Sequence, residues 1–321
     1  MASRLLAEEF VRQGHEVAVV TGSAGEGENL WPFAVVRRPR LLELLQLVRR
    51  SDVYFQNHIS LRRAWPLLFV RRPWVVALHT WVPRLGIAGR LQHFSLRYAR
   101  CIANSNPIAA HVRARSVVIP GPYDDHVFRE MPGVPRDGHL LFVGRLIRDK
   151  GVHLLLEAIA RLRMEGLEPS LTIVGRGPEK DALARQVKDL RLAAQVEFAG
   201  VKAGNELALL LNRHRILVVP SLWQEPFGIV ALEGIACGCV LVGSDRGGLK
   251  EAIGPCGITF PNGDSAALAV CLTHLLSSPE GWEQYREGAA SHLRPFTRAA
   301  VARSYLQVLQ AAYDQSNRRA S

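Results

Sequence analysis

The segment that decides the fold is residues 140–164, which read LLFVGRLIRDKGVHLLLEAIARLRM. It opens with four apolar residues, as a short buried strand does. A turn bounded by two glycines follows, and then apolar residues recur at helical spacing, at Val152, Leu155, Leu156, Ile159 and Leu162. That spacing puts one apolar stripe on a helix. A strand, a glycine turn and an amphipathic helix in this order predict one unit of a doubly wound parallel α/β sheet.

The same alternation continues to about residue 277. It predicts strands at 140–143, 171–174, 196–199, 216–219, 240–242 and 258–260. The helices between them are expected near 151–164, 179–190, 204–212, 228–237 and 264–277. Short apolar runs separated by crossover helices are typical of parallel sheets covered on both faces. The second half of the chain is therefore predicted to form a Rossmann-like domain.

The first half has the same rhythm with more interruptions. A helix over 2–13 ends at Gly14, and strands are expected at 16–21, 34–36, 53–55, 74–79, 101–103 and 117–119. Residues 120–135 are dense in Pro and Gly and read as a linker. We predict two Rossmann-like domains, over residues 1–133 and 134–297. Residues 298–321 contain a final helix, expected to pack back across the domain junction.

The composition excludes several classes of protein. An apolar share of 48% and a charged share of 21% are ordinary for a globular protein. No apolar run reaches the roughly 18 residues that a membrane-spanning helix needs. The first ten residues hold an acidic pair where a signal peptide needs an apolar run. The five cysteines lack CxxC spacing, which favours reduced thiols in a cytoplasmic protein.

The net charge of +11 is unevenly distributed. Residues 1–135 hold 18 Arg, no Lys and 10 acidic residues, a balance of +8. Arginine pairs at 37–38, 49–50, 62–63 and 71–72 lie beside apolar segments, notably 41–48 and 65–70. This pattern suits peripheral contact with an anionic membrane, on its inner face. The alternative is that these are solvated surface arginines. No motif selects nucleic acid.

The turn after the first strand of the second half is a candidate anion site. It runs from Gly144 to Gly151 and contains Arg145 and Lys150. At the carboxyl end of a parallel strand, helix-terminal N–H groups and two cations converge where an anion can sit. We predict that Arg145 and Lys150 bind a diphosphate. The alternative is an ordinary basic surface turn.

Further glycine turns are expected at the same sheet edge. Gly175 and Gly200 end successive strands and leave room for a flat base, although simple turn chemistry also explains each of them. Gly247 and Gly248 follow a later strand, and their N–H groups are expected to reach phosphate or sugar oxygens. We predict that these four glycines contribute to a nucleotide site.

The most specific stretch is residues 220–234, PSLWQEPFGIVALEG. Pro226 suits the first turn of a helix, which would leave three N–H groups facing the crevice, those of Phe227, Gly228 and Ile229. On such a helix Glu225 and Glu233 stand about 12 Å apart. The two carboxylates of a glycosidase stand about 5 to 9.5 Å apart. Glu225 and Glu233 instead suit the sugar and the ribose at opposite ends of an extended ligand. Each residue alone also has a simpler explanation: Glu225 as a glutamate favoured by the helix dipole, and Glu233 as a surface glutamate.

Two histidines of the first half follow strands. His79 closes the strand over 74–79, which favours a place in a binding cleft, while a lone His is more often structural. His58 is the weaker candidate. The histidines form no cluster with metal-ligand spacing.

Together these segments resemble glycosyltransferase family 4, a group of retaining enzymes with the GT-B fold. The matching pieces occur in the family's order, at residues 14–17, 19–21, 78–80, 144–145, 150–151, 173–178, 196–200, 225–233, 247–251 and 260–264. The ordered set is specific, although no one motif decides the assignment. The resemblance implies two Rossmann-like domains facing a central cleft, with the acceptor mainly on the first and the donor on the second.

The resemblance also implies a reaction. It is metal-independent transfer of a hexose-type sugar from a nucleoside diphosphate sugar to a glycan or lipid-linked acceptor, as in polysaccharide or cell-envelope biosynthesis. Arg145 and Lys150 would stabilise the leaving diphosphate, Glu233 would hold the ribose, Glu225 would contact the donor sugar, and His79 would lie near that sugar. No cofactor is expected.

The chain departs from the family at its start. Members open with a strand and a Gly-rich loop, and this sequence begins in the helix that should follow them. We expect a start codon assigned too late; an upstream stop codon with no strand-plus-glycine segment would overturn this.

A truncated, non-catalytic nucleotide-sugar-binding subunit and a GT-B sugar-nucleotide epimerase stay open as alternatives. A dehydrogenase is disfavoured because Gly175 and Gly177 lack the third glycine of the dinucleotide turn.

Overall fold

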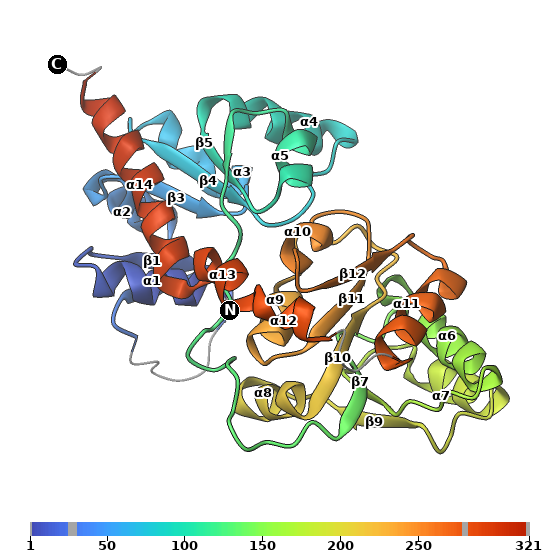
Figure 1. Ribbon diagram of the computed structural model, residues 1–321. Coiled ribbons are helices and arrows are strands. Elements are labelled where there is room, and N and C mark those ends of the chain that lie inside the picture. Colours follow the sequence, from blue (N-terminus) through green and yellow to red (C-terminus); the bar gives the residue numbers. More distant parts are fainter. Residues whose placement is uncertain (1, 25–30, 278–281, 319–321) are drawn as a thin grey trace. The chain divides into compact units, whose positions relative to one another are not determined.

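The computed structural model describes residues 2–24, 31–277 and 282–318 (Figure 1). The chain forms two compact units. The first comprises Met1–Pro122 and Phe296–Ser321, and the second comprises Tyr123–Pro295. The second unit thus begins earlier than the predicted residue 134. One reason is the buried Asn212, whose side chain accepts from the N–H of Met131 at 2.7 Å and donates to the carbonyl of Arg129 at 3.0 Å. These bonds tie the predicted linker to the second unit.

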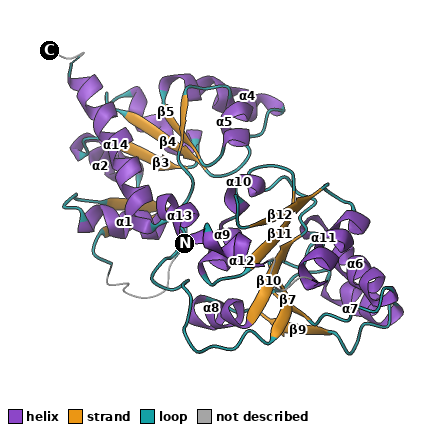
Figure 2. Cartoon of the chain, viewed as in Figure 1, coloured by secondary structure: helices purple, strands orange, loops and turns teal. Residues whose placement is uncertain are grey.

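The second unit is built on a six-stranded parallel sheet (Figure 2). Its strands are β7 (Gly138–Val143), β8 (Leu171–Val174), β9 (Val196–Gly200), β10 (His214–Val219), β11 (Val240–Ser244) and β12 (Gly257–Phe260), in the spatial order β12-β11-β10-β7-β8-β9. All six predicted strands are confirmed. The order reverses between β7 and β10, and open α/β sheets bind ligands outside the carboxyl ends of the strands at such a switch point.

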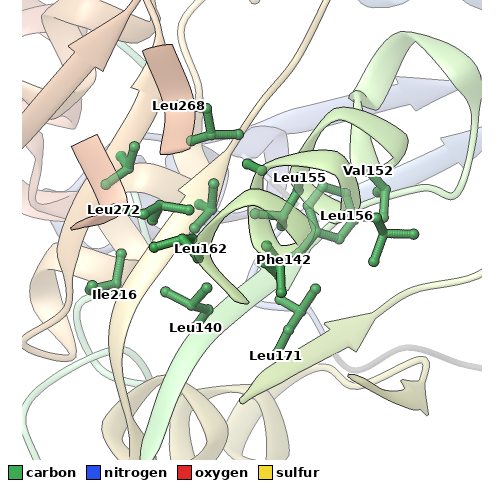
Figure 3. Close-up of a cluster of buried hydrophobic side chains, with 14 of the residues drawn as sticks. Leu140, Phe142, Val152, Leu155, Leu156, Leu162, Leu171, Ile216, Leu268 and Leu272 are labelled. Atoms are coloured by element: carbon green, nitrogen blue, oxygen red, sulfur yellow. The ribbon is translucent and has the colours of Figure 1, made fainter. Parts of the chain in front are cut away.

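Helices connect these strands or follow the last of them. They are α6 (Val152–Met164), α7 (Lys180–Asp189), α8 (Gly204–Arg213), α9 (Ile229–Ala236), α10 (Leu249–Ile253), α11 (Ser265–Ser277), α12 (Glu283–Glu287) and α13 (Ala289–Leu293), with short 3-10 turns η3 (Arg148–Lys150) and η5 (Arg294–Phe296). The stripe predicted on α6 is confirmed, because all five of its residues are buried. They pack with sheet residues such as Leu140 and Ile216, and with Leu268 and Leu272 of α11, in one core (Figure 3).

The first unit holds two separate parallel sheets. β1 (Ala18–Thr21) pairs with β2 (Ala34–Arg37), and the other sheet has the order β3 (Tyr54–Asn57), β4 (Trp74–Leu78), β5 (Arg100–Ala103), β6 (Ser116–Val118). Its helices are α1 (Ala2–Arg12), α2 (Leu41–Arg50), α3 (Leu61–Ala64), α4 (Gly86–Ser95), α5 (Asn106–Val112) and α14 (Arg298–Asn317), with 3-10 turns η1 (Trp65–Leu68) and η2 (Leu96–Tyr98). The predicted elements form, but the sequence does not indicate the division into two sheets.

The last helix, α14, is part of the first unit. It packs beside α1 and against β4, and the fully buried ring of Tyr305 lies in the core that these elements share. A guanidinium N–H of Arg298 donates to the carboxylate of Glu8 at 2.6 Å, which joins the N-terminal turn of α14 to α1. The first unit therefore draws on both ends of the sequence.

Candidate functional site

The candidate site of the second unit is a pocket at the switch point of its sheet. The pocket has a volume of about 240 Å³ and is lined by Arg145, Ile147, Asp149, Lys150, Trp223 and Glu225. The first four follow β7, and the other two follow β10. Arg145, Lys150 and Glu225, predicted from two separate segments, are thus brought together.

Close backbone approaches hold the loops around this pocket. A Cβ atom on Gly151 would lie 1.9 Å from the carbonyl oxygen of Pro220, and one on Gly175 would lie 1.8 Å from that of Gly144. Only glycine fits where backbones approach so closely. The N–H of Gly175 also donates to the carbonyl of Gly200 at 2.7 Å. These glycines hold the loops in place, and the predicted contact of Gly175 and Gly200 with a base stays a prediction.

The loops after β7 and β10 are bonded to each other directly. The carbonyl of Asp149 accepts from the N–H of Leu222 at 2.8 Å and from that of Trp223 at 3.1 Å. Trp223 is 44% exposed and presents an aromatic surface to the pocket. Neither Trp223 nor Asp149 was predicted as a site residue, because their place in the pocket depends on contact between loops far apart in the sequence.

The side chain of Glu225 is held by two hydrogen bonds. Its Oε1 atom accepts from Nζ of Lys150 at 2.5 Å and from the hydroxyl of Ser221 at 2.6 Å. Its residue is buried, with 9% of its surface exposed. A carboxylate held by a cation and a hydroxyl is oriented before any ligand arrives. An anionic ligand that binds Lys150 would have to share this cation with Glu225.

The backbone of Glu225 is held by the turn before α10. Gly247 pairs with Glu225 in an isolated parallel bridge, and the N–H of Gly248 donates to the Glu225 carbonyl at 2.7 Å. A Cβ atom on Gly247 would lie 2.2 Å from that carbonyl oxygen. Both glycines were predicted to offer N–H groups to ligand oxygens. In the structure the N–H of Gly248 positions Glu225 instead.

The start of α9 differs from the prediction. The helix begins at Ile229, and Gly228 precedes it with a φ of 105°, so the expectation that Pro226 occupies the first turn is wrong. The physical reason is local packing, because Gly228 lies against Leu249 and the side chain of Phe227 is buried. The separation of about 12 Å assumed one continuous helix from Glu225 to Glu233 and does not apply. The predicted ligand contacts of Phe227, Gly228 and Ile229 stay predictions.

Glu233 lies on α9 and is largely buried. Burial, and to a lesser extent the charge of Asp124, raise the pKa of its carboxyl to about 7. Asp124 is itself buried. Next to Glu233, a Cβ atom on Gly234 would lie 2.4 Å from Leu217, so α9 packs tightly on β10. Asp124 was not predicted as a site residue, since it lies more than 100 positions earlier in a segment read as a linker.

The first unit brings two histidines together at the ends of adjacent strands. Nε2 of His79, after β4, lies 2.5 Å from Oδ1 of Asn57 at the end of β3, so this nitrogen donates. Burial, and then the charge of His58, lower the pKa of His79 to about 4. His58 has a φ of 86°, rare for a residue other than glycine. Its Nδ1 atom is buried with no hydrogen-bond partner among the described residues. These two features make His58 a stronger candidate for a site residue than its sequence context indicated.

The described part of the chain was searched for metal-binding groups and for membrane-spanning helices. Within residues 2–24, 31–277 and 282–318, no group of three or more His, Cys, Asp or Glu side chains is arranged to hold a metal ion. None of the helices in those ranges combines the length and the apolar character needed to cross a membrane.

Comparison with known proteins gives consistent matches. The family model of the glycosyl transferases group 1 matches residues 129–292, which is 164 of the 321 residues. Glycogen synthase of Mycobacterium tuberculosis (strain ATCC 25618 / H37Rv) is 39% identical over 183 residues, covering 56% of this chain and 44% of the relative. The chain therefore matches less than half of that relative's length.

Two solved structures share the fold. Sucrose-phosphate synthase from Thermosynechococcus elongatus has a TM-score of 0.82 at 21% identity, covering 98% of this chain and 93% of that one. Anabaena HepE in complex with UDP-glucose has a TM-score of 0.79 at 21% identity, covering 97% and 96%. The predicted GT-B architecture of two Rossmann-like domains is confirmed by these likenesses.

Proposed function

Because this chain belongs to the glycosyl transferases group 1 family, we propose that it transfers a hexose-type sugar from a nucleoside diphosphate sugar to a glycan or lipid-linked acceptor. The proposed transfer retains the anomeric configuration and needs no metal ion. The observation that carries the proposal is the pocket in which Arg145, Lys150 and Glu225 meet at the switch point of the sheet. Two cations beside a fixed carboxylate suit a ligand with a diphosphate and a hydroxylated sugar.

In the proposed reaction, the bond between the sugar C1 and the diphosphate oxygen breaks, and its electron pair goes to the diphosphate. Arg145 and Lys150 stabilise the charge that develops there. The acceptor hydroxyl oxygen bonds to C1 on the same face, and its proton passes to the departing phosphate oxygen. Glu225 accepts hydrogen bonds from the donor sugar, and Glu233 accepts them from the ribose. His79 is assigned to the donor sugar on the family resemblance alone.

The ion pair between Lys150 and Glu225 gives this proposal an order of events. When a diphosphate binds Lys150, the cation is shared with the ligand, and Oε1 of Glu225 is released in part to accept a sugar hydroxyl. Ser221 continues to hold the carboxylate in place. Donor binding thus prepares Glu225 for the sugar.

Support for the donor comes from the relatives. Anabaena HepE was solved in complex with UDP-glucose and shares this fold, so a UDP-hexose is the first donor to examine. Support for a lipid-linked, cell-envelope acceptor is the basic first unit, which favours peripheral contact with the anionic inner face of a membrane from the cytoplasm.

The test is transfer by the full chain. Radiolabelled UDP-hexoses are incubated with glycan and lipid-linked acceptors, and products are separated by chromatography. We expect label in an acceptor with the wild type and in none with Glu225→Ala, which should still bind UDP. Glu206→Ala is the matched control, because Glu206 is exposed on α8.

Three outcomes would contradict the proposal. UDP-sugar binding without turnover in any acceptor assay would indicate a binding subunit. Conversion of the donor sugar without an acceptor would indicate an epimerase. Loss of transfer in EDTA, restored by a divalent cation, would contradict the metal-independent part.

A further inference from the structure

A row of apolar side chains lies exposed along α4 of the first unit. It consists of Leu85, Ile87, Leu91, Phe94 and Tyr98, which are 88%, 80%, 51%, 53% and 72% exposed. Ile87, Leu91 and Phe94 follow helical spacing, so they share one face of α4. We call these five residues the α4 face. Five large apolar side chains exposed on one short segment are unusual for a surface that meets only water.

The packing of α4 directs this face away from its own unit. Gly89 is buried, and a Cβ atom there would lie 2.3 Å from the carbonyl oxygen of Pro83. Leu96, just after the helix, is fully buried in the core. The opposite side of α4 is therefore held against its own unit by close backbone contact and by an apolar anchor, and the α4 face has no place in that core.

Arginines flank the α4 face. Arg90 and Arg97 are exposed, and the guanidinium of Arg97 lies 5.9 Å from the ring centroid of Phe94. Arg84 donates to the carbonyl of His111 at 2.7 Å, which fixes its position beside Leu85. A long side chain of this kind can lay its stem along an apolar layer and keep its charge at the boundary with water.

The charged residues of the sequence segment that contains the α4 face have one sign. Between Asp52 and Asp124 the sequence contains ten arginines and not one acidic residue. A second copy of this chain would present the same positive face, and like charges would oppose symmetric pairing. An anionic bilayer offers both an apolar interior and negative headgroups, which together complement the face.

We propose that the α4 face docks the protein on an anionic membrane surface, with Ile87, Leu91 and Phe94 inserted among the lipids and Arg90 and Arg97 at the headgroups. This inference rests on the proposed membrane contact of the first unit and names the surface that makes it. It differs from the face suggested by the paired arginines of the sequence.

That other face is formed by α2, η1 and the residue after η1. Leu41, Leu42, Leu68 and Phe69 are 69%, 73%, 82% and 70% exposed there, and the two elements are in contact. However, α2 carries the acidic Glu43 in its first turn, and its residues Leu44 and Val48 are buried, as on an ordinary helix packed against its own domain. The α2 and η1 surface therefore serves as a matched control.

The experiment measures co-sedimentation of the full chain with vesicles. One set is phosphatidylcholine alone, and the other contains about 30 mol% phosphatidylglycerol. We expect the wild type to bind the anionic set and to lose most of that binding at about 0.5 M NaCl. Ile87→Ser/Leu91→Ser/Phe94→Ser should weaken partition by at least about tenfold. Arg90→Glu/Arg97→Glu should do the same without removing apolar area.

Leu68→Ser/Phe69→Ser is the control and should bind as the wild type does. Melting temperature and UDP binding are measured on every variant, so that a misfolded variant is recognised; if the serine variant misfolds, the charge-reversal variant decides.

The results separate the α4 face from the broader proposals. If the wild type does not prefer anionic vesicles, both the membrane contact and the α4 face are wrong, while the transferase proposal stands on its own assay. If folded α4 variants bind as well as the wild type, the contact stands and the α4 face is wrong. If the α4 variants change the oligomeric state but not vesicle binding, the face serves self-association and the proposal is overturned.

Discussion

The Nζ atom of Lys150 lies 2.5 Å from Oε1 of Glu225, although the two residues are 75 positions apart in the sequence. Each comes from a loop at the carboxyl end of a strand, β7 for Lys150 and β10 for Glu225. Because these strands are neighbours at the switch point of the sheet, the cation and the carboxylate meet in one pocket.

Lys150→Met should lower kcat/KM for sugar transfer by about 10²- to 10³-fold, because it removes a cation from the leaving diphosphate. UDP affinity should also fall. Lys202→Met is the matched control, since Lys202 is more exposed and lies 3.9 Å from Glu206 on the surface. Steady-state kinetics and calorimetric UDP titration measure both effects. A Lys150 variant as active as the Lys202 variant would exclude Lys150 from the reaction.

Gly247→Ala should disturb Glu225 through the backbone. The new Cβ atom would lie 2.2 Å from the carbonyl oxygen of Glu225, at a φ of 74°. We expect about 2 to 4 kcal/mol lower unfolding free energy and loss of transfer. Gly166→Ala separates the strain of a left-handed backbone from the clash with Glu225, because Gly166 has a φ of 83° with nothing within 4 Å of the added atom. It should cost about 1 kcal/mol and preserve activity. If denaturant unfolding showed that both variants lower the unfolding free energy equally, the clash with Glu225 would not contribute to the loss of stability.

Glu233 should make stability depend on pH. Its folded pKa of about 7 lies above the ordinary value of 4.5, so the folded protein holds this proton more tightly than the unfolded chain does. The stability from the protonated carboxyl is present below about pH 4.5 and is lost as the pH rises to about 7. The loss is at most about 3 kcal/mol. Glu233→Gln should remove this slope, as measured by denaturant unfolding at about pH 5 and pH 8. An unchanged slope in the variant would assign the titration to another group.

His58→Gly tests the strained histidine beside His79. Glycine accepts a φ of 86° without the steric strain of a Cβ atom, so the variant should be about as stable as the wild type despite the lost side chain. The pKa of His79 should rise only slightly from about 4, because burial lowers it more than the charge of His58 does. Ring-proton NMR titration reports this pKa. A return of His79 to near 6.5 would show that the charge of His58 dominates instead.

The strands and the stripe of α6 could be predicted because they depend on short-range patterns. Leu140 to Val143 is apolar because both faces of its strand are covered, and that property is visible in a window of a few residues. Arg145, Lys150 and Glu225 could be placed at one edge for the same reason, since parallel strands bring their carboxyl ends together.

Other features depend on contacts that no local pattern records. The start of α9 is set by the packing of Gly228 on Leu249, and the raised pKa of Glu233 depends in part on Asp124. Trp223 enters the pocket because its N–H bonds to the Asp149 carbonyl in another loop. No pattern in residues 85–98 indicates the α4 face, which is evident only from the exposure of its side chains. Apart from the α4 face, these features depend on contacts between residues far apart in the sequence.

The place of α14 has a consequence for biosynthesis. A ribosome makes residues 2–122 of the first unit, then the whole second unit, and only afterwards the helix that brings Tyr305 into the first unit's core. The second unit can complete its core during translation, whereas the first must wait with part of its apolar surface uncovered. A nascent chain that stalls before Arg298 would carry a finished second unit and an unfinished first unit. Chaperones that bind exposed apolar surface are therefore expected to engage the first unit for longer than the second.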